Sequence, residues 1–264
     1  MTTMTTLTTG VRSAGEFCWI NMLTPEPKAA CDFFAAVLGW TYGEIPGMGY
    51  TVKAGGHEIG GLFDFAGPNT PPGVQPYIGV MVKVDNADAA CDRVRALGGT
   101  AQPAFDIGGR LRMAVCKDPS GVEFDLWESK SAVGMEVDRR VPGAPSWFEA
   151  LTRNPGRATP FYRDLFGWTS TSAPIPEEPG ESYTTFERDG RPVAGLLELT
   201  PRMTGPGPQW AVYFTVADAD AAAATAVERG GIQGFPVRAV PGVGRFCALA
   251  SPQGVMFYVL ELAA

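Results

Sequence analysis

The chain contains an internal repeat, and a repeat of this length limits the fold to two copies of one structural unit. The stretch at 24–40, TPEPKAACDFFAAVLGW, aligns with NPGRATPFYRDLFGW at 154–168 at an offset of 128 residues. Each stretch contains a turn, an amphipathic segment, an aromatic pair and a final Gly-Trp. Further along the chain, 84–99 aligns with 216–231 at an offset of 132 residues.

A third pair of segments, 108–128 and 242–261, aligns at an offset of 133 residues from the arginine onward. Because the offset drifts by only a few residues, the copies differ by short loop insertions within a unit of about 120 residues. The polar stretch with Gly and Pro between the copies is expected to be a linker. We therefore predict four segments: a disordered tail at 1–14, a first domain at 15–128, a linker at 129–143 and a second domain at 144–264.

Each copy contains a weaker duplication of strand and helix patterns. The run at 17–23 is typical of a strand, and a helix with Thr24 as its N-cap follows it. Strand-like runs hinged by glycines come after each predicted helix. The predicted order is β-α-β-β-β, twice in each copy and four times in the chain, which is an α+β fold. Pro160 lies inside the third predicted helix, so we expect this helix to start later or to kink there.

Charge and hydropathy argue against two classes of partner. The formal net charge is −7 and no cluster of Lys and Arg occurs, which argues against nucleic acid. No run of about 18 apolar residues occurs, which argues against a membrane span. The first residues, MTTMTTLTTG, have no basic region followed by an apolar one and do not resemble a signal peptide, so we expect a cytoplasmic protein.

The five cysteines and the single histidine limit nucleophilic and zinc chemistry. No two cysteines form a C-x-x-C pair, and we expect all five to be buried thiols in a reducing compartment. His57 is the only histidine that a cysteine nucleophile could use as its base. A zinc site made of several His and Cys is short of ligands.

Four motifs follow one another along the chain: a strand, a helix ending in Leu-Gly-Trp, a later V-D-x-x-x-A helix, and a final strand after D-P-S-G. Their order resembles that of the glyoxalase, bleomycin-resistance and extradiol-dioxygenase superfamily, also called vicinal oxygen chelate proteins. The resemblance covers about 15–130 and 144–262, and it is strongest to the tandem two-domain glyoxalase-like or hydroxylase-like branch. It implies that the four βαβββ modules form two glyoxalase-like domains, each with a curved sheet that closes into a cup for a small molecule.

The resemblance also implies a divalent metal, held by His or Gln on the first strand of each module and by Glu on the last. The corresponding positions are Trp19, about Gly61, about Gly79 and Asp125 in the first domain, and Trp147, about Gly195, about Ala211 and Tyr258 in the second. Only Asp125 among them can coordinate a metal, whereas a catalytic cation needs at least three protein ligands. The chain departs from the metal-dependent members here, and we expect no metal and no other cofactor.

Strand alternation predicts which side chains line the cups. If Trp19 faces inward, Asn21 and Leu23 do so too, while Ile20 and Met22 pack beneath the helix. The other predicted inward residues are Glu123, Asp125 and Trp127 in the first cup, and Trp147, Glu149, Leu151, Met256, Tyr258 and Leu260 in the second. Each wall combines an aromatic ring with polar groups, which suits a flat, partly aromatic ligand.

For a reaction without a metal, Asp125 and Glu149 are the candidate bases, and Tyr258 is the candidate acid or oxyanion donor. The candidate ligand-binding residues are Trp19, Asn21, Glu123, Trp127, Trp147 and His57. Structural alternatives stay open for several of them. The tryptophans at 19 and 147 could simply fill their cups, Glu149 could pair with an arginine, and His57 could be an exposed turn residue.

Three functions are compatible with these features. The first is a metal-independent enzyme that acts on a small aromatic or carbonyl-containing metabolite by elimination, isomerisation or a hydroxylase-like step, in secondary metabolism or detoxification. The second is a protein that binds an antibiotic without changing it, as bleomycin-resistance members do. The third is an interaction protein whose cups are filled. The first two predict a small organic ligand as the partner, and either a monomer or a homodimer fits a chain with two complete domains.

Overall fold

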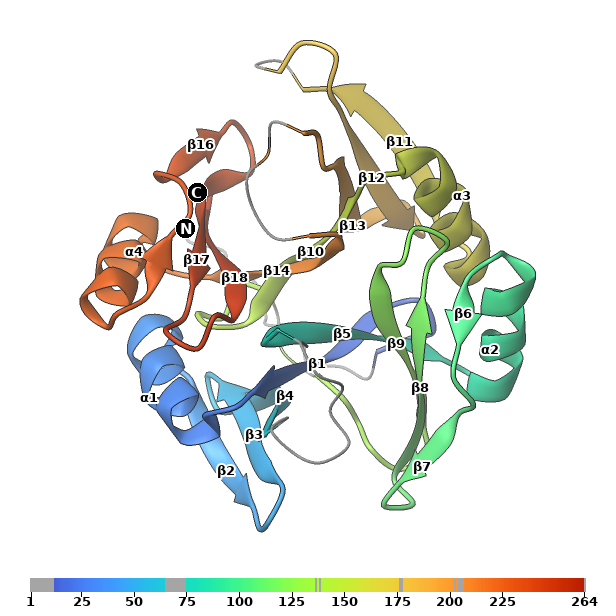
Figure 1. Ribbon diagram of the computed structural model, residues 1–264, viewed down its shortest axis with the longest axis horizontal. Helices are drawn as coiled ribbons and strands as arrows, with labels where there is room; N and C mark the ends of the chain where they lie inside the picture. The colour runs from blue at the N-terminus through green and yellow to red at the C-terminus, as the bar shows by residue number, and fades with distance from the viewer. Residues whose placement is uncertain are drawn as a thin grey trace, which may run out of the picture.

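Two sheets of nine strands each, with the same strand order, make up the computed structural model, which describes residues 12–64, 75–135, 137, 139–175, 178–201, 203 and 207–263. Each half of the chain builds one sheet (Figure 1). The predicted tail at 1–14 lies outside the described residues except for its last three. At that end, the Arg12 guanidinium donates hydrogen bonds to the carbonyls of Met135 and Val137, at 2.9 and 2.8 Å.

The first sheet has the spatial order β2 (Thr41–Ile45), β3 (Gly49–Ala54), β4 (His57–Asp64), β1 (Phe17–Thr24), β5 (Tyr77–Val84), β9 (Glu123–Ser129), β8 (Leu111–Lys117) and β6 (Thr100–Ala101), with β7 (Phe105–Ile107) also paired to β8. Helix α1 (Pro27–Leu38) follows β1, and helix α2 (Ala87–Ala96) follows β5.

The second sheet has the order β11 (Thr169–Pro174), β12 (Ser182–Arg188), β13 (Arg191–Glu198), β10 (Pro145–Thr152), β14 (Gln209–Thr215), β18 (Met256–Leu262), β17 (Gly244–Ala250) and β15 (Ile232–Gln233), with β16 (Arg238–Val240) paired to β17. Helix α3 (Pro155–Phe166) follows β10, and helix α4 (Ala219–Glu228) follows β14.

The pairing of strands confirms the α+β class and the four modules. In the first half, β1 pairs in parallel with β4 of its own module and antiparallel with β5 of the next, so the two modules join through their first strands. The second half repeats this with β10, β13 and β14. The second module of each half differs in one detail from β-α-β-β-β, because the first strand after its helix is broken into two short pieces, β6 and β7 or β15 and β16.

Two helix details differ from the sequence prediction. Helix α1 has Glu26 as its N-cap, not Thr24, because Thr24 still pairs with Asp64 as the last residue of β1. Helix α3 starts at Pro155 and runs through Pro160. The cost of the missing N–H is offset because Phe161 and Tyr162, the two residues after the proline, are buried in the core.

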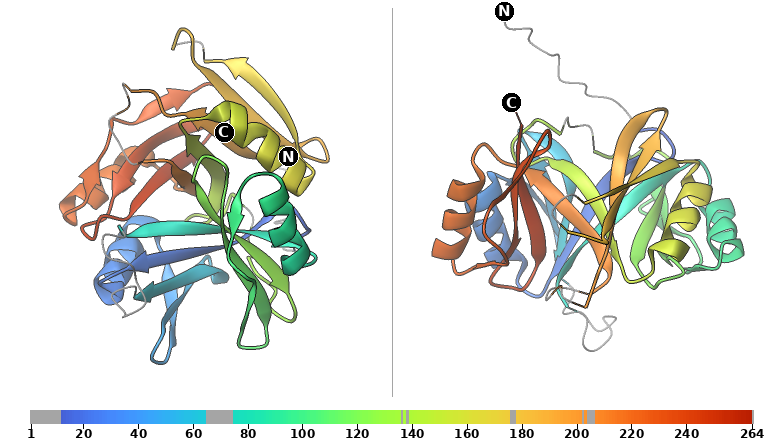
Figure 2. Two further views of the ribbon diagram at one scale, coloured as in Figure 1. Left: turned by 45° about the vertical axis from the view of Figure 1, so that its right-hand side comes forward. Right: turned by 90° about the horizontal axis from the view of Figure 1, so that it is seen from above.

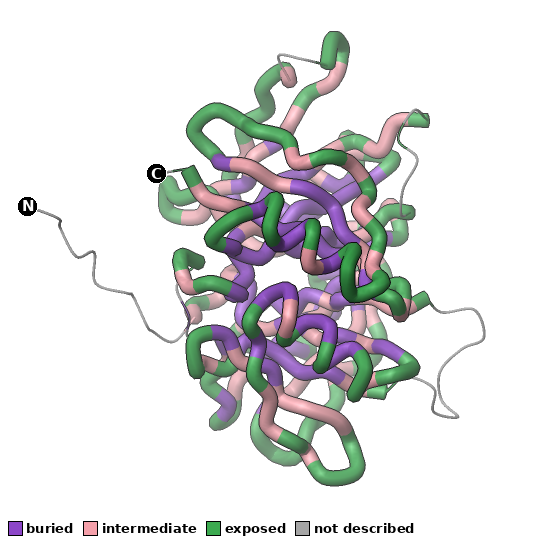
Figure 3. The backbone as a smooth tube through the Cα atoms, turned by 90° about the vertical axis from the view of Figure 1, so that its left-hand side faces the viewer, coloured by how far each residue is buried: buried purple, intermediate pink, exposed green. Residues whose placement is uncertain are grey.

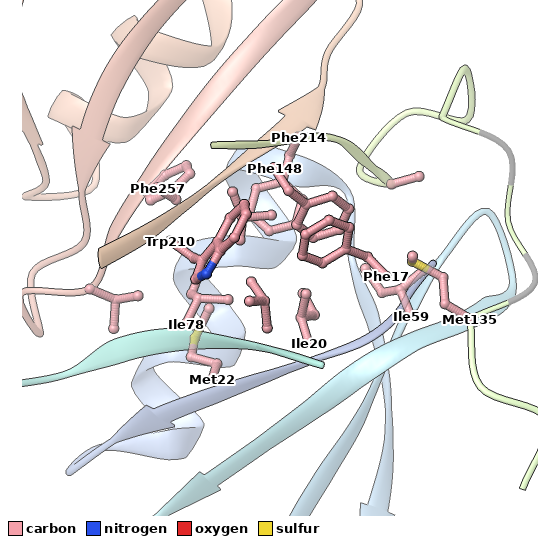
Figure 4. Packing of buried hydrophobic residues seen from close by; sticks show 14 of the residues in the cluster. Phe17, Ile20, Met22, Ile59, Ile78, Met135, Phe148, Trp210, Phe214 and Phe257 are labelled. Atoms are coloured by element: carbon pink, nitrogen blue, oxygen red, sulfur yellow. The ribbon is translucent and has the colours of Figure 1, made fainter. Parts of the chain in front are cut away.

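The core lies between the two sheets, which curve away from each other so that their concave faces point outward (Figure 1). Strand β1 alternates as predicted: Ile20 and Met22 are each 1% exposed on the core side, whereas Trp19 and Asn21 are partly exposed on the other. Side chains from both halves interdigitate in this core (Figure 4). The rings of Phe17 and Phe148, from equivalent first strands, stack at 4.0 Å with 6° between their planes.

The helices flank this interface in two cross-domain pairs. Helix α1 packs beside α4, and α2 beside α3, at opposite ends of the molecule (Figure 2). Buried backbone is concentrated where the two halves meet, and the outer hairpins are mostly exposed (Figure 3). In the described part of the chain, no helix has the length and apolar character that crossing a membrane requires.

In each half, one tryptophan donates a hydrogen bond to the segment that leads into the other half. Helices α1 and α3 both end at a glycine in the left-handed region, Gly39 and Gly167, and a tryptophan follows. The Trp40 Nε1 donates to the Gly143 carbonyl at 2.8 Å. In return, the Trp168 Nε1 donates to the Gly15 carbonyl at 2.9 Å. The repeated Gly-Trp motif is therefore a reciprocal link between the halves.

Replacing Phe17 by alanine should lower the free energy of unfolding by about 3–5 kcal/mol, because it removes a buried ring from the interface and leaves a cavity. The loss should affect both halves in one transition, followed by urea denaturation with circular dichroism and tryptophan fluorescence. Phe105→Ala is the control, since Phe105 is 42% exposed, and should change stability by less than about 0.5 kcal/mol. A loss below about 1 kcal/mol for Phe17→Ala would contradict a stabilising role of the stack.

Candidate functional site

The concave faces of the two sheets are the candidate sites. Cup 1 is the face of the first sheet that displays Trp19, Asn21 and Asp125, and cup 2 is the face of the second sheet that displays Trp147 and Glu149. The two faces use equivalent ladder positions, since Trp19 pairs with Met81 as Trp147 pairs with Tyr213.

One wall of cup 1 is made of two indoles. The rings of Trp19 and Trp127 lie 5.6 Å apart with 36° between their planes. The Trp19 Nε1 donates a hydrogen bond to Asn21 Oδ1 at 3.1 Å. Trp127 is buried, but Trp19 and Asn21 remain partly exposed, so this wall offers an aromatic face and an amide to a ligand.

Asp125 lies on the floor of cup 1. On strand β9 it pairs with Met81 and with Val115. Burial, and then the negative charge of Glu123, raise its pKa from 3.8 to about 7. Within the described residues no group donates a hydrogen bond to its carboxyl oxygens, so no contact there offsets the burial. Asp125 is therefore a carboxyl that changes charge near neutral pH.

Glu123 is held at the rim of the same cup. The Tyr77 hydroxyl donates to Glu123 Oε1 at 3.3 Å, and the Lys117 ammonium lies 3.6 Å from Oε2. Sequence reasoning did not identify Tyr77, which enters the site because β5 lies between β1 and β9.

Cup 2 contains a buried carboxyl, that of Glu149, which is hydrogen-bonded within the protein. Glu149 is 5% exposed, and the Tyr213 hydroxyl donates to its Oε2 at 3.0 Å. Burial raises the pKa of Glu149, while hydrogen bonds from Tyr183 and Tyr213 act in the opposite direction. The partners of Glu149 are thus tyrosines, and the alternative of an arginine partner was wrong.

The floor of cup 2 is filled by one tyrosine. The Trp147 Nε1 donates to the Tyr183 hydroxyl at 2.8 Å. A Cβ on Gly195 would overlap this hydroxyl, so the phenol occupies the space that the glycine leaves. Tyr183 was not identified from the sequence, because its counterpart in the first half is Gly49 and the repeat gives no signal for it.

The remaining space of cup 2 is closed by further apolar side chains. Tyr258 stacks on Tyr213 with ring centroids 4.5 Å apart. The buried members of this cluster are Leu151, Ala211, Tyr213, Ala248, Tyr258 and Leu260. Cup 1 has a buried cluster as well, made of Cys18, Met81, Leu111, Trp127 and Ala132, with Trp19 packed against it. The two cups differ in their polar groups: Glu149 is buried in cup 2, whereas Asn21, Glu123 and Asp125 in cup 1 are partly exposed.

The positions where the family pattern places metal ligands do not fit a divalent cation. In cup 1 a Cβ on Gly61 would overlap the Phe63 ring, and Gly79 offers no side chain beside Asp125. In cup 2 the equivalent space holds Tyr183. Across the described residues, no group of three or more His, Cys, Asp and Glu side chains is arranged to hold a metal ion.

The structure sorts the predicted site residues into two separate sets. Cup 1 brings together Trp19, Asn21, Glu123, Asp125 and Trp127, and cup 2 brings together Trp147, Glu149 and Tyr258. Asp125 and Glu149 thus lie on different sheets and cannot act as one pair. His57 joins neither set, because it begins β4 at a hairpin opposite Ala54, three strands from β9.

A family model described as "Glyoxalase/Bleomycin resistance protein/Dioxygenase superfamily" matches residues 17–126 and 145–259. "Putative glyoxylase CFP32" of Mycobacterium tuberculosis (strain CDC 1551 / Oshkosh) is 35% identical over an alignment of length 250 that covers 93% of this chain and 94% of that protein. "Anthracycline biosynthesis protein DauV" of Streptomyces sp. (strain C5) is 33% identical over an alignment of length 268 that covers 94% of each chain. The Mn(II)-bound glyoxalase from Novosphingobium aromaticivorans shares the fold, with a TM-score of 0.65 at 16% identity over 97% of this chain and 83% of that chain.

Asp125→Asn should remove a pH dependence of stability. Because the pKa of Asp125 is about 7 in the folded protein and 3.8 ordinarily, the folded state keeps a proton that the unfolded chain releases. This contribution to stability is full below about pH 4 and is lost as the pH rises to about 7. Urea denaturation across this range should show the wild type losing stability relative to the variant. Glu123→Gln removes a negative charge that raises the folded pKa of Asp125, so the loss should be smaller and end at lower pH. Parallel profiles for wild type and Asp125→Asn would contradict the assignment.

Glu149→Gln should be well tolerated, because a neutral amide oxygen still accepts the Tyr213 hydrogen bond and burial disfavours the carboxylate. Glu149→Ala should cost about 1–3 kcal/mol or more, since it leaves the buried Tyr213 hydroxyl without an acceptor. Urea denaturation near neutral pH compares the two. Equal losses for both variants would show that the carboxylate charge stabilises cup 2.

Proposed function

Since the chain belongs to the glyoxalase/bleomycin resistance protein/dioxygenase superfamily, we propose that it is a metal-independent enzyme with its working site in cup 1. Its substrate is a small, flat, partly aromatic compound that contains a carbonyl group. Asp125 is the general base. The site residues Trp19, Asn21, Glu123 and Trp127 bind and orient the substrate.

The observation that supports this proposal most is the environment of Asp125. A base works best when its pKa lies near the working pH, and Asp125 has a pKa of about 7. The carboxyl shares the concave face with the pair of indoles of Trp19 and Trp127, where an aromatic substrate can stack. An unpaired carboxyl on a floor of this kind is a costly arrangement for stability alone, which favours a catalytic role.

The donor set of the cups supports chemistry without a metal. A single carboxylate at the metal-ligand positions cannot supply the three ligands that a catalytic cation needs. The reactions compatible with one base are proton abstraction next to a carbonyl, followed by elimination or by return of the proton at another carbon. Cup 2, filled by Tyr183 and Tyr213, then has a structural role.

The setting of the reaction is part of the same proposal. One relative has a name that refers to anthracycline biosynthesis, which supports a place in secondary metabolism. The five cysteines are free and buried, as predicted from the sequence, and this supports the reducing environment of the cytoplasm. We place the protein there as a monomer or a homodimer, with a small organic molecule as its partner and with neither nucleic acid nor membrane.

The indole pair is the one feature that favours a second function, in which the protein sequesters an antibiotic without changing it chemically. Trp19 and Trp127 would bind a flat ring whether or not a proton is moved. The two functions make opposite predictions for turnover, and the next experiment separates them.

The wild-type protein should accelerate exchange of the α protons of 2-tetralone, a bicyclic aromatic ketone, for deuterium in D₂O, followed by proton NMR. Asp125→Asn should lower the rate about 100-fold or more, because a positioned general base contributes factors of this size. The rate should rise as the pH passes through about 7, the pKa of Asp125. Tryptophan fluorescence checks that both proteins still bind the ketone.

Tyr183→Phe removes a hydrogen bond in cup 2 and is the matched control, which should keep the wild-type rate. Binding without exchange by the wild type would support sequestration in place of catalysis. An unchanged rate in Asp125→Asn would remove Asp125 as the base, and a loss only in Glu149→Gln would move the reaction to cup 2.

A further inference from the structure

Asn21 lies between two glycines on the floor of cup 1. On the ladder it pairs with Gly61 of β4 on one side and with Gly79 of β5 on the other. The Phe63 ring covers the Gly61 side. On the Gly79 side lies the ring of Tyr77, also on β5, whose Cε2 is 3.3 Å from the position that a Gly79 Cβ would take. Aromatic rings thus border the glycines on both sides of Asn21.

The orientation of this amide is fixed by Trp19. An indole N–H can only donate, so the atom that accepts from Trp19 Nε1 at 3.1 Å is the Asn21 Oδ1. The two N–H groups of Nδ2 have no acceptor among the residues that the structure describes. The amide therefore has donors available for a ligand.

The space above Gly79 connects this amide to the candidate base. A point at the Cβ position of Gly79 lies 3.9 Å from Asp125 Oδ2 and 3.7 Å from the main-chain carbonyl of Asn21. Directly opposite residues in an antiparallel pair project on the same face, so the Asn21 side chain borders the same space. A group of substrate atoms placed above Gly79 is within reach of both residues.

We infer that Asn21 is the electrophilic group of cup 1, which donates a hydrogen bond from Nδ2 to the carbonyl oxygen of a flat, partly aromatic ketone while Asp125 removes a proton from the neighbouring sp³ carbon. This inference rests on the proposed function and names its substrate class. The C–H bond breaks and its proton moves to the Asp125 carboxylate. The electron pair moves through the C–C bond to the carbonyl oxygen, which becomes an enolate oxygen held by the Asn21 N–H. Return of the proton to carbon completes an isomerisation or an exchange, with no other reactant.

The chemistry requires such a donor. An enolate oxygen in a partly buried cup needs a positive charge or a hydrogen-bond donor to stabilise it. The residues at the metal-ligand positions do not fit a cation, and the Tyr77 hydroxyl already donates to Glu123. Trp19 then has two roles, as a stacking surface and as a positioning residue for the amide. Cup 2 lacks this arrangement, since Glu149 replaces the amide and accepts a hydrogen bond from Tyr213.

The test uses the full chain with three probes: 2-tetralone for proton exchange, 2-naphthol as a stable analogue of its enol, and naphthalene as the same ring system without oxygen. The variants are Asn21→Leu and Asn21→Asp, which both lack the amide donor but differ in charge, and Trp19→Phe, which keeps a ring but lacks the N–H. Tyr183→Phe in cup 2 is the matched control. Melting temperatures identify any variant that is not folded.

The wild type should bind 2-naphthol about tenfold more tightly than naphthalene, as expected for one well-placed hydrogen-bonded oxygen. Asn21→Leu should lose this preference and keep the affinity for naphthalene. Both Asn21 variants should exchange 2-tetralone at least about 100-fold more slowly than the wild type, the effect of removing one oxyanion donor. Trp19→Phe should lower the preference for 2-naphthol and the turnover number, and Tyr183→Phe should match the wild type.

If both Asn21 variants exchange 2-tetralone at the wild-type rate and keep the wild-type preference for 2-naphthol, the role of Asn21 is overturned. If Asp125→Asn is inactive in the same experiment, the proposed function survives that result. Unchanged exchange in Asp125→Asn, or no exchange by the wild type, removes the proposed function and this inference together. A Trp19→Phe variant with full preference for 2-naphthol would contradict the positioning role of Trp19.

Discussion

The aromatic contact between the backs of the two sheets is the interaction on which the rest of the structure depends. Phe17 and Phe148 stack at its centre, and the indoles of Trp40 and Trp168 close it from both sides through hydrogen bonds to Gly143 and Gly15. Because each helix-bearing face is covered by the other half, the main core lies there, and the concave faces carry only smaller buried clusters. The concave faces are then available for side chains that a folding core would not tolerate, such as an unpaired carboxyl.

The two concave faces carry different side chains at equivalent positions. At equivalent positions, cup 1 has Asn21 where cup 2 has Glu149, and it has Asp125 where cup 2 has Tyr258. Cup 2 surrounds its carboxyl with phenol groups and apolar side chains, so its polar atoms are satisfied internally. Cup 1 leaves the Nδ2 donors of Asn21 and the carboxyl of Asp125 without hydrogen-bond partners in the described part of the chain, and this is an arrangement that a ligand can complete. One sheet geometry thus supports a packed structural face and a candidate reactive face.

The sequence was sufficient for the fold, because the repeat, the glycine-terminated helices and the alternation on β1 all depend on local patterns. Two-residue periodicity also placed Trp19 and Asn21 on one face of β1, and the resemblance to the family placed Asp125 on the same face of the sheet. The sequence could not find Tyr183, whose contact with Trp147 depends on the register between β12 and β13 and on the missing Cβ of Gly195. The predicted N-cap of α1 was wrong, and α3 does not start after Pro160, because tertiary pairing and burial outweighed local capping and proline rules. The near-neutral pKa of Asp125 depends on solvation, which no residue pattern reports.

The reciprocal tryptophan links have a further consequence. Equivalent residues of the two halves make equivalent contacts with each other, which is the property of an isologous interface with two-fold symmetry. The two halves of the chain are thus arranged like the two subunits of a symmetric dimer, but they belong to one polypeptide. In a dimer of identical subunits, every substitution appears in both cups at once. Here the two copies are joined covalently and differ in sequence, so one cup can lose its ligand-facing groups and serve as a scaffold while the other keeps them.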